Sequence, residues 1–385
     1  MATLRLFKDL KGKIMENLKI SCPCHFGLES VLSGEMKRLG FADVTSDNGK
    51  VSFSGGLSDV AKANINLRTA ERVLLELASF TALSFEELFQ GVKAIPWEDF
   101  ICVDEAFPVK GWSLNSKLHS VPDCQSIIKK AVVRRLEGKY GISIFPETGA
   151  KHQIQFSILK DKVCIYLDTS GEGLHKRGYR RNSNAAPIKE TLAAGILDIA
   201  RVKGESTVYD PMCGSGTFLI ESFLRATKTA PSLRRYFAAE NWKIFDKSIF
   251  KEARAEALDK IDRSVSFKGF GSDIDADAVR LSIENSKKAN AENRLSFKQM
   301  DVKDFSLTDG GIVICNPPYG ERLSDIRTAE AIYREMGRVF ERKSGVNYYI
   351  ITPHEEFESL FGRKADKRRK LYNGMIKCTL YQYFL

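Results

Sequence analysis

The spacing of hydrophobic positions changes several times along the chain, and each change coincides with turn-forming residues. Over residues 18–67, apolar residues at every second position predict strands, and apolar residues three or four apart predict helices. The predicted order is strand, helix, strand, strand, helix, at residues 18–23, 27–39, 44–46, 50–53 and 57–67. The two central strands flank Asp47-Asn48-Gly49, which favours a tight hairpin turn. This order is typical of a small ferredoxin-like module.

A second α+β pattern follows in residues 68–168. Strands are predicted at 68–78, 107–113, 154–158 and 163–168, and helices at 84–92 and 126–138. Ser84 stands where a helix N-cap is expected, and Glu87 completes the capping-box spacing. Four cations lie on or near one side of the second helix: Lys129, Lys130, Arg134 and Arg135. Such a stripe suits phosphate binding, although a solvated helix face gives the same pattern.

From residue 206 onward, short apolar runs alternate with helical spacing, which predicts βα units and a parallel sheet. Strands are predicted at 206–210, 267–273, 295–301, 312–315 and 348–352. The last two predicted strands, 367–371 and 375–384, flank Asn373-Gly374, a strong hairpin signal. We therefore expect an α/β domain whose parallel sheet ends in an antiparallel hairpin.

The composition of the 385-residue chain favours folded domains and limits the classes of function. Hydrophobic residues make up 43%, which excludes a disordered protein, and no apolar run approaches the length of a membrane span. The N-terminus lacks the apolar core of a signal peptide, so a cytoplasmic location is expected. Of eight cysteines only Cys22 and Cys24 are closely spaced, without a second pair at zinc-ligand spacing, and we predict no metal site. The net charge of +10 favours a polyanionic partner such as nucleic acid.

The segment from Ile312 to Gly320 combines an apolar strand with a stiff polar loop. Neither Pro317 nor Pro318 has an N–H group, so neither can continue the strand. Open α/β sheets bind ligands at the carboxyl ends of their strands. An Asn amide and a backbone carbonyl there are suited to accept hydrogen bonds from an amino group, and Tyr319 offers a flat face for a base. A plain Asn-Pro turn after a strand is the alternative.

The sequence Asn-Pro-Pro-Tyr at residues 316–319 resembles the catalytic loop of S-adenosylmethionine-dependent methyltransferases. The enzymes concerned methylate amino nitrogens of bases, glutamine or related planar amides. The resemblance implies that the Asn316 side chain and the Pro317 carbonyl hold the amino group, and that Tyr319 stacks on the ring. It also implies direct methyl transfer to nitrogen, with S-adenosylhomocysteine as the cofactor product and no metal ion.

A glycine-rich segment follows the strand at 206–210 and precedes an apolar helix. Strand, glycine-rich turn and helix form a nucleotide-type pocket, because glycine lets the backbone approach a ligand closely. The segment lacks the spacing of the dinucleotide fingerprint and the lysine of a P-loop. It resembles the S-adenosylmethionine motif of the same methyltransferases. The cofactor contacts implied by this resemblance are Asp210, Pro211, Cys213, Gly214, Ser215, Gly216 and Thr217.

Further cofactor contacts are expected at the ends of the next strands. An acid at such a strand end is suited to bind both ribose hydroxyls, and the resemblance assigns this role to Asp273. Ile274 would then lie against the adenine face, and Asp301 would accept a hydrogen bond from the adenine amino group. Asn316 would border the cofactor as well as the substrate. Asp275 is expected to cap the helix that follows.

The region before residue 169 resembles a THUMP domain, an RNA-binding module of tRNA- and rRNA-modifying enzymes. The resemblance rests on residues 67–73, 113–120, the basic helix from Ser126, and 167–171. A basic hinge at 174–181 resembles the linker that precedes the catalytic domain in these enzymes. The candidate RNA-binding residues are Lys129, Lys130, Arg134, Arg135, Lys176, Arg177, Arg180 and Arg181.

Taken together, the chain is identified as a member of the THUMP-containing class I RNA methyltransferases and is most similar to bacterial enzymes that form N2-methylguanosine in 23S rRNA. The expected fold is α/β, a Rossmann-like class I methyltransferase with a seven-stranded mixed sheet, preceded by an α+β ferredoxin-like and THUMP region. The expected domains are 1–60 (lead-in and ferredoxin-like module), 61–168 (THUMP) and 169–385 (methyltransferase). Alternatives are adenine N6 methylation of DNA or RNA, guanine N2 methylation of tRNA, and a non-catalytic RNA-binding protein. The sequence leaves the target nucleotide and the oligomeric state open.

Overall fold

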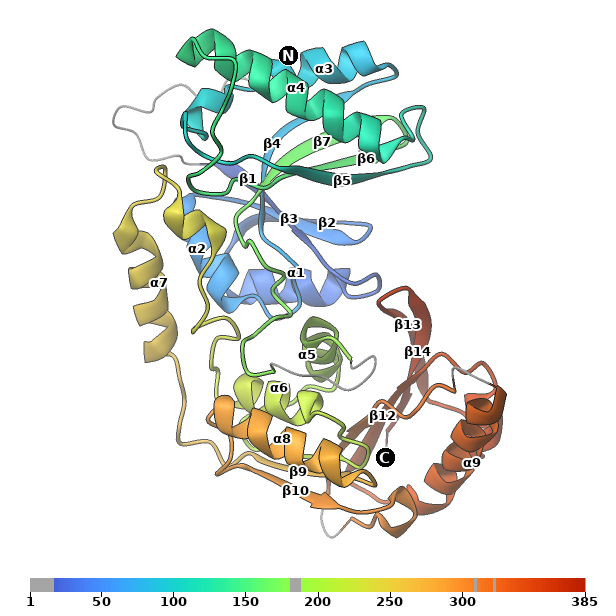
Figure 1. The fold of residues 1–385 in the computed structure, drawn as a ribbon. Helices are drawn as coiled ribbons and strands as arrows, with labels where there is room; N and C mark the ends of the chain where they lie inside the picture. Colours follow the sequence, from blue (N-terminus) through green and yellow to red (C-terminus); the bar gives the residue numbers. More distant parts are fainter. Residues whose placement is uncertain (1–16, 181–187, 308–309, 321–322, 385) are drawn as a thin grey trace.

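The computed structural model describes residues 17–180, 188–307, 310–320 and 323–384. Two seven-stranded sheets form the two halves of the molecule, one above the other in Figure 1. Within the described ranges, every helix is too short or too polar to cross a bilayer.

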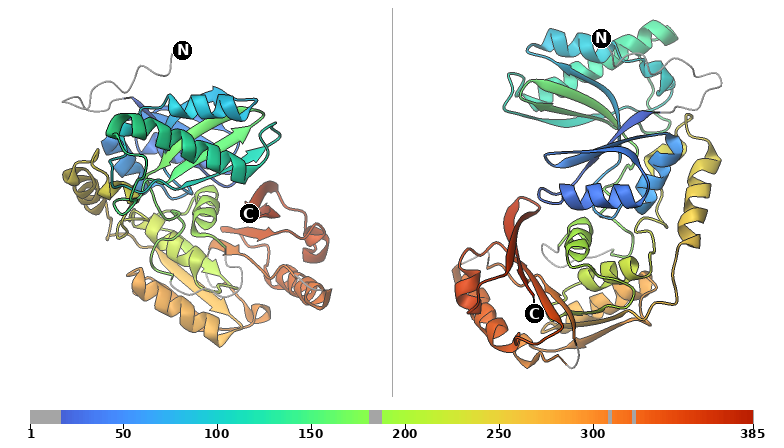
Figure 2. Two further views of the ribbon diagram at one scale, coloured as in Figure 1. Left: turned by 45° about the horizontal axis from the view of Figure 1, so that its top comes forward. Right: turned by 180° about the vertical axis from the view of Figure 1, so that it is seen from behind.

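The N-terminal half is an α+β unit built on one sheet. Its elements are β1 (Leu18–Pro23), α1 (Glu29–Arg38), β2 (Ala42–Asp47), β3 (Lys50–Gly55), α2 (Leu57–Asn66), β4 (Leu74–Thr81), α3 (Phe85–Lys93), η2 (Trp97–Asp99), β5 (Val109–Leu114), α4 (Val121–Tyr140), β6 (Ile154–Leu159) and β7 (Lys162–Asp168). Helices α1 and α2 lie beside strands β1 to β3, and helices α3 and α4 lie beside strands β4 to β7 (Figures 1 and 2). The strand order is β2-β3-β1-β4-β7-β6-β5, with β5 and β6 parallel and the other pairs antiparallel.

Strand β4 joins the ferredoxin-like part of this sheet to the THUMP part. Its first two residues, Leu74 and Leu75, pair with β1, and its full length pairs with β7. The ferredoxin-like order predicted for residues 18–67 is confirmed. The predicted boundary after residue 60 falls inside α2 and is therefore corrected, because a domain cannot be divided within a helix that packs on its own sheet. We propose that the first module extends to β4; the boundary after residue 168 stays a prediction.

Two predicted elements begin five or more residues from the expected start. Helix α4 starts at Val121, not at 126, because Ser120 accepts a hydrogen bond from the Asp123 amide (3.4 Å) and Pro122 is tolerated in the first helical turn. Strand β4 starts at Leu74, not at 68. The segment before it crosses to the other half of the molecule, where the Arg68 guanidinium donates to the Thr229 carbonyl (2.7 Å).

The C-terminal half is a mixed sheet with helices on both faces. Its elements are α5 (Glu190–Ile199), β8 (Thr207–Asp210), α6 (Thr217–Ala226), η3 (Ala238–Asn241), α7 (Lys247–Asp259), β9 (Lys268–Asp273), α8 (Ala276–Lys288), β10 (Leu295–Gln299), η4 (Val302–Asp304), β11 (Gly311–Cys315), α9 (Leu323–Val339), β12 (Val346–Thr352), α10 (Phe357–Phe361), β13 (Lys367–Asn373) and β14 (Ile376–Tyr383). The order β10-β9-β8-β11-β12-β14-β13 has five parallel strands followed by an antiparallel hairpin, which confirms the predicted class I methyltransferase topology.

The central parallel strands β8, β11 and β12 are largely buried on both faces, as their apolar runs predict. Ile314 and Tyr349 point to the face that α5 and α6 cover, and Val313 and Tyr348 point to the face that α9 and α10 cover. The insertion between α6 and β9 leaves this sheet and returns to the N-terminal half. There α7 packs beside α2 (Figure 1), and Trp242 is buried in the N-terminal core.

A carboxylate at the joint ties the two halves together. Glu71, between α2 and β4, accepts hydrogen bonds from Thr191 on α5 and from Lys189 (3.1 Å), and it lies 3.1 Å from the His25 imidazole. Burial acts to raise the pKa of Glu71, but hydrogen bonds from His175 and His25 outweigh it and hold the pKa well below its usual range. Glu71 is therefore a charged carboxylate that accepts hydrogen bonds from donors in both halves.

Candidate active site

Four polar side chains stand at the carboxyl ends of four neighbouring parallel strands. Asp210 ends β8, Asp273 ends β9, Asp301 follows β10, and Asn316 follows β11. Parallel strands bring their carboxyl ends to one edge, so residues separated by more than 100 positions in the sequence meet there. The strand order reverses between β8 and β11, and this switch point is where open α/β sheets have their ligand crevice.

The glycine-rich turn between β8 and α6 is held in shape by its neighbours. Gly214 and Gly216 have φ values of 52° and 79°, which L side chains rarely adopt. A Cβ on Gly216 would also come within 3.0 Å of the Ser282 side chain. The Asn285 amide donates to the Ser215 carbonyl (3.0 Å), and Gly216 is the N-cap residue of α6. The turn is therefore rigid and presents its backbone to the crevice.

The Asp273 carboxylate links two loops at the edge of the sheet. Its Oδ2 accepts a hydrogen bond from the Gly214 amide (2.9 Å), and its Oδ1 accepts one from the Asp275 amide (3.0 Å). Asp275 in turn caps α8 by accepting from the Asp277 amide (2.8 Å), as predicted. Each carboxylate oxygen of Asp273 has a second lone pair and can therefore accept a further hydrogen bond. The geometry suits a ligand with two adjacent hydroxyl groups.

The pKa values of two acids of the crevice are shifted in opposite directions. Burial raises the pKa of Asp210 well above its usual range, and the nearby Asp273 raises it further, against a hydrogen bond from the Met212 amide. By contrast, the Lys303 amide donates to the half-buried Asp301 and lowers the pKa of that carboxyl. A cationic group in the crevice would favour the ionised form of Asp210, because opposite charge offsets the cost of burial.

These residues surround a cavity of about 600 Å³. Its walls include all but one of the sequence-predicted cofactor residues, together with Pro317 and Tyr319. The predicted residues in the walls are Asp210, Pro211, Cys213, Gly214, Ser215, Thr217, Asp273, Ile274, Asp301, Asn316, Pro317 and Tyr319. Gly216 does not line the cavity and instead starts α6. Ile274 is 66% exposed, so an apolar surface is open to a ligand in this cavity.

Some wall residues were not singled out in the sequence. Met212 and Phe218 lie within or next to the glycine-rich motif, and their position there was the available signal. Thr328 and Ile332 come from α9 and close the far side of the cavity. Nothing in the local sequence of α9 distinguishes them from other residues of an amphipathic helix.

The Asn-Pro-Pro-Tyr loop is fixed by hydrogen bonds from two directions. The Tyr319 hydroxyl donates to Asn316 Oδ1 (2.6 Å) and accepts from the Asn373 amide (3.3 Å) at the tip of the β13–β14 hairpin. Burial raises the pKa of Tyr319, and the nearby Cys378 raises it further, so the hydroxyl stays protonated. Asn316 Oδ1 has a second lone pair, so it remains able to accept an amino hydrogen.

A buried tyrosine on α9 supports this loop from behind. The Tyr333 hydroxyl donates to the Pro318 carbonyl (2.7 Å) and lies 3.0 Å from Thr352 Oγ1 at the end of β12. Burial raises the pKa of Tyr333 to about 12, which keeps it a donor. The loop therefore has little freedom to move relative to the sheet.

The eight candidate RNA-binding cations do not share one environment. Lys130 is exposed, and among the described residues it has no carboxylate partner. Four others are engaged in ion pairs: Lys129 with Glu147, Arg134 with Glu137, Arg135 with Glu98, and Lys176 with Glu172. Ion pairing at the surface leaves these four accessible, so their RNA role stays a prediction. Arg181 lies outside the described residues.

Two hinge arginines are placed inside the protein. Arg177 is 5% exposed and pairs with the buried Glu221 (3.3 Å), so the prediction that it contacts RNA is wrong. Removing a buried arginine from its carboxylate to bind phosphate would leave that carboxylate unpaired in the core. Arg180 is half-buried and donates to Glu190 (3.0 Å) and to Thr217 Oγ1 (3.1 Å), which places it behind the glycine-rich turn.

All eight cysteines are free. Among the described residues, no group of three or more His, Cys, Asp or Glu side chains is arranged to hold a metal ion. Cys213 lines the cavity, but burial raises the pKa of its thiol well above the usual range, so it is a packing residue with a neutral thiol.

The chain matches three family models. Residues 19–74 match the RlmL ferredoxin-like domain, residues 82–168 match the THUMP domain, and residues 177–382 match the RMKL-like methyltransferase domain. The last match covers more than half of the chain.

Individual relatives agree with these matches. The chain is 43% identical over 373 residues to "Putative RNA methyltransferase YpsC" of Bacillus subtilis, covering 96% of this chain and 97% of that protein. It is 34% identical over 372 residues to "Ribosomal RNA large subunit methyltransferase K/L" of Psychromonas ingrahamii, covering 94% of this chain and 49% of the relative, so it spans about half of that protein. A solved structure, "SMU.472, a putative methyltransferase complexed with SAH", superposes with a TM-score of 0.90 at 38% identity, covering 96% of this chain and 98% of that one.

Proposed function

The chain belongs to the RMKL-like methyltransferase family, and from this we propose that it transfers a methyl group from S-adenosylmethionine to the exocyclic N2 of a guanine in large-subunit ribosomal RNA. The observation that supports this most is the Asn316-Pro317-Pro318-Tyr319 loop beside a cavity with several carboxylates at the switch point of the sheet. Ribosomal RNA is favoured by the names of relatives that share the N-terminal half. Guanine N2 follows from the resemblance of the whole arrangement to enzymes with that product. A cytoplasmic location stays a prediction.

The cavity fits S-adenosylmethionine in the chemistry of its donors and acceptors. We propose that Asp273 accepts from both ribose hydroxyls with its two free lone pairs, and that Ile274 covers one face of the adenine. Asp301 would accept from the adenine amino group. Asp210 would lie near the positive charge of the cofactor; within the described residues, no cation is among the groups that shift the pKa of its buried carboxyl. S-adenosylmethionine supplies an activated methyl group, carried on a positively charged sulfur.

The residues of the catalytic loop would act by positioning. The second lone pair of Asn316 Oδ1 and the Pro317 carbonyl would accept the two hydrogens of the amino group, which aims the nitrogen lone pair at the methyl donor. The Tyr319 ring would cover the base while its hydroxyl holds the Asn316 amide in one orientation. Tyr333 would keep the loop in place from behind. Rigid positioning of this kind removes much of the entropic cost of bringing two reactants together.

The target base has to leave its stack to reach this cavity, because a paired guanine keeps its amino group inside the duplex. The cost of unstacking is a few kcal/mol and is least for a base in a loop or bulge. We therefore expect the target in a single-stranded or irregular part of the RNA.

The proposal is tested by methyl transfer from labelled S-adenosylmethionine. Ribosomal RNA, tRNA and DNA from a strain that lacks the protein are incubated separately with the enzyme and digested to nucleosides. Label in N2-methylguanosine of the large-subunit RNA is expected. Label in N6-methyladenosine, or in tRNA only, would reassign the base or the RNA and leave the family intact. Cofactor binding without transfer to any nucleic acid would contradict the proposed substrate class.

A further inference from the structure

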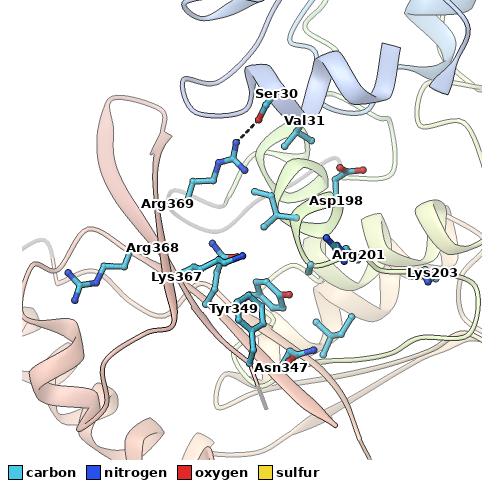
Figure 3. Close-up of a pocket in the computed structure, with 15 residues that line it drawn as sticks. Ser30, Val31, Asp198, Arg201, Lys203, Asn347, Tyr349, Lys367, Arg368 and Arg369 are labelled. Atoms are coloured by element: carbon cyan, nitrogen blue, oxygen red, sulfur yellow. Dashed lines mark hydrogen bonds between the residues drawn. The ribbon is translucent and has the colours of Figure 1, made fainter. Parts of the chain in front are cut away.

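A second cavity, of about 1080 Å³, lies at the junction of the two halves and away from the catalytic loop. It is bounded by α1, the C-terminal end of α5, and strands β12 to β14 of the second sheet, as Figure 3 shows. Its roof is fixed by Arg369 on β13, which donates to the Gly27 carbonyl (3.0 Å) and to Ser30 on α1 (2.7 Å). We call this cavity the basic cleft.

The walls of the basic cleft are strongly cationic. Five of the residues that line it carry a positive charge: Arg201, Lys203, Lys367, Arg368 and Arg369. Asp198 is the single acid among the lining residues, and it is already neutralised by Arg38 (2.7 Å) and Arg225 (2.7 Å). The cleft therefore concentrates positive charge that the fold itself does not balance.

Three of these cations remain available to a ligand. Arg368 pairs with Glu358, and Arg369 is used to fix the roof. In the part of the chain that the structure describes, Arg201, Lys203 and Lys367 have no carboxylate partner, and all three are exposed. Figure 3 shows Arg201 and Lys367 on the two sides of Tyr349, the first just after the end of α5 and the second on β13. Both walls of the cleft thus offer charge to the same occupant.

The position of the cleft relates it to the proposed reaction. Helix α5 runs between the two cavities: Ile188, just before its start, lines the cofactor cavity, and Arg201, just after its end, lines the basic cleft. At 10 residues, α5 is about 15 Å long. At about 3.4 Å of axis per phosphate, the value for one strand of duplex DNA, this separation spans about four nucleotides.

We infer that the basic cleft binds the phosphodiester backbone of the RNA substrate, a few nucleotides from the methylated base. This inference rests on the proposed function, because an acceptor on RNA is what brings a polyanion to α5. Arg201, Lys203 and Lys367 contact phosphates from both walls, and the contact is independent of base sequence. Because α1 forms the roof, the bound strand also contacts both halves of the protein and orients the THUMP-containing half relative to the catalytic one.

The test compares two triple variants with the same change in charge. Arg201→Ala/Lys203→Ala/Lys367→Ala removes the free cations of the cleft. Lys247→Ala/Lys251→Ala/Lys260→Ala removes three exposed lysines on or next to α7, which are unpaired within the described residues and do not line the cleft. The probe is a fluorescein-labelled single-stranded RNA of mixed sequence, and the dissociation constant is measured by anisotropy between about 50 and 200 mM salt. Binding of S-adenosylhomocysteine serves as the check on folding.

The cleft variant is expected to bind the probe at least tenfold more weakly, with a salt dependence less steep by about one unit of log-log slope for each lost contact. The α7 variant is expected to retain the wild-type slope. Equal slopes in the wild type and the cleft variant would overturn the inference. The inference would also be overturned if inorganic phosphate displaced the probe as effectively as unlabelled RNA at equal ionic strength, because that result indicates a site for small anions. If the wild type neither binds nor methylates RNA, the proposed function itself fails, and the two failures are thereby distinguished.

Discussion

Asp273 provides the most direct test of the cofactor site, because its carboxylate has two duties. Each oxygen already accepts one backbone amide, from Gly214 and from Asp275, and each is proposed to accept one ribose hydroxyl as well. The variant Asp273→Ala removes all four interactions. The backbone amides it leaves behind line an open cavity where water replaces the lost acceptor, so the main loss falls on ligand binding.

The expected magnitude follows from the number of hydrogen bonds. A hydrogen bond to a charged group contributes about 1.5 kcal/mol or more, so two ribose hydroxyls amount to about 3 kcal/mol. With 1.4 kcal/mol per tenfold, the dissociation constant of S-adenosylhomocysteine should rise by about 10- to 150-fold, the lower limit allowing for water in the empty site. Asp273→Asn should be nearly as harmful. Its single carbonyl oxygen can serve only one of the two backbone amides, and its NH2 group would face the other.

Isothermal titration with S-adenosylhomocysteine measures this effect. The matched control is Asp275→Asn, which removes the same charge from the same cavity but acts on the α8 cap. The control should bind nearly as well as the wild type. An unchanged dissociation constant in Asp273→Ala would refute the ribose assignment. Equal losses in both variants would show that net charge, and not a specific pair of hydrogen bonds, governs the affinity.

Three further predictions concern neighbouring groups. Asn316→Ala should lower methyl transfer by about 10²- to 10³-fold while S-adenosylhomocysteine binding persists; loss of binding would place Asn316 in another role. Burial raises the pKa of Asp210, so its carboxyl takes up a proton as the pH falls through that raised pKa, and the affinity for the cationic S-adenosylmethionine should fall as the carboxyl loses its charge. Asp210→Asn should abolish this pH dependence of the affinity. The same pH profile in the variant and the wild type would contradict the prediction. Tyr333→Phe should lower the free energy of unfolding by about 1 kcal/mol in chemical denaturation. It should also lower the rate of methyl transfer more than the affinity for the cofactor. Equal losses of rate and affinity would indicate a general loss of structure.

Much of the lining of the proposed cofactor cavity was predictable because its polar residues lie in short contiguous motifs at strand ends. Asp210, Asp273, Asp301 and Asn316 each follow an apolar run, and the rule that parallel strands end at one edge brings them together. The contributions of α9 were not predictable. Tyr333 reaches the loop only because α9 packs on the face of the sheet formed by Val313, and an amphipathic helix carries no mark of which residue will do so.

The candidate RNA-binding residues show where a local pattern misleads. Arg177 and Lys176 are adjacent in a basic segment, yet one is buried against Glu221 and the other is exposed beside Glu172. A run of cations reports charge and not exposure, since each side chain is free to point either way until the halves dock. The basic cleft shows the converse. Arg201 and Lys367 are far apart in the sequence and became neighbours only through the placement of β13 beside α5.

The sequence by itself determined the order of elements, the ferredoxin-like and methyltransferase topologies, and the motifs that line the proposed cofactor cavity, because periodicity, caps and turns act over a few residues. It did not determine that both N-terminal modules share one sheet through β4, because two residues of pairing with β1 leave no local signal. Nor did it determine the joint at Glu71 or the basic cleft. These depend on how two independently patterned halves pack, and packing brings together residues whose positions in the sequence carry no information about one another.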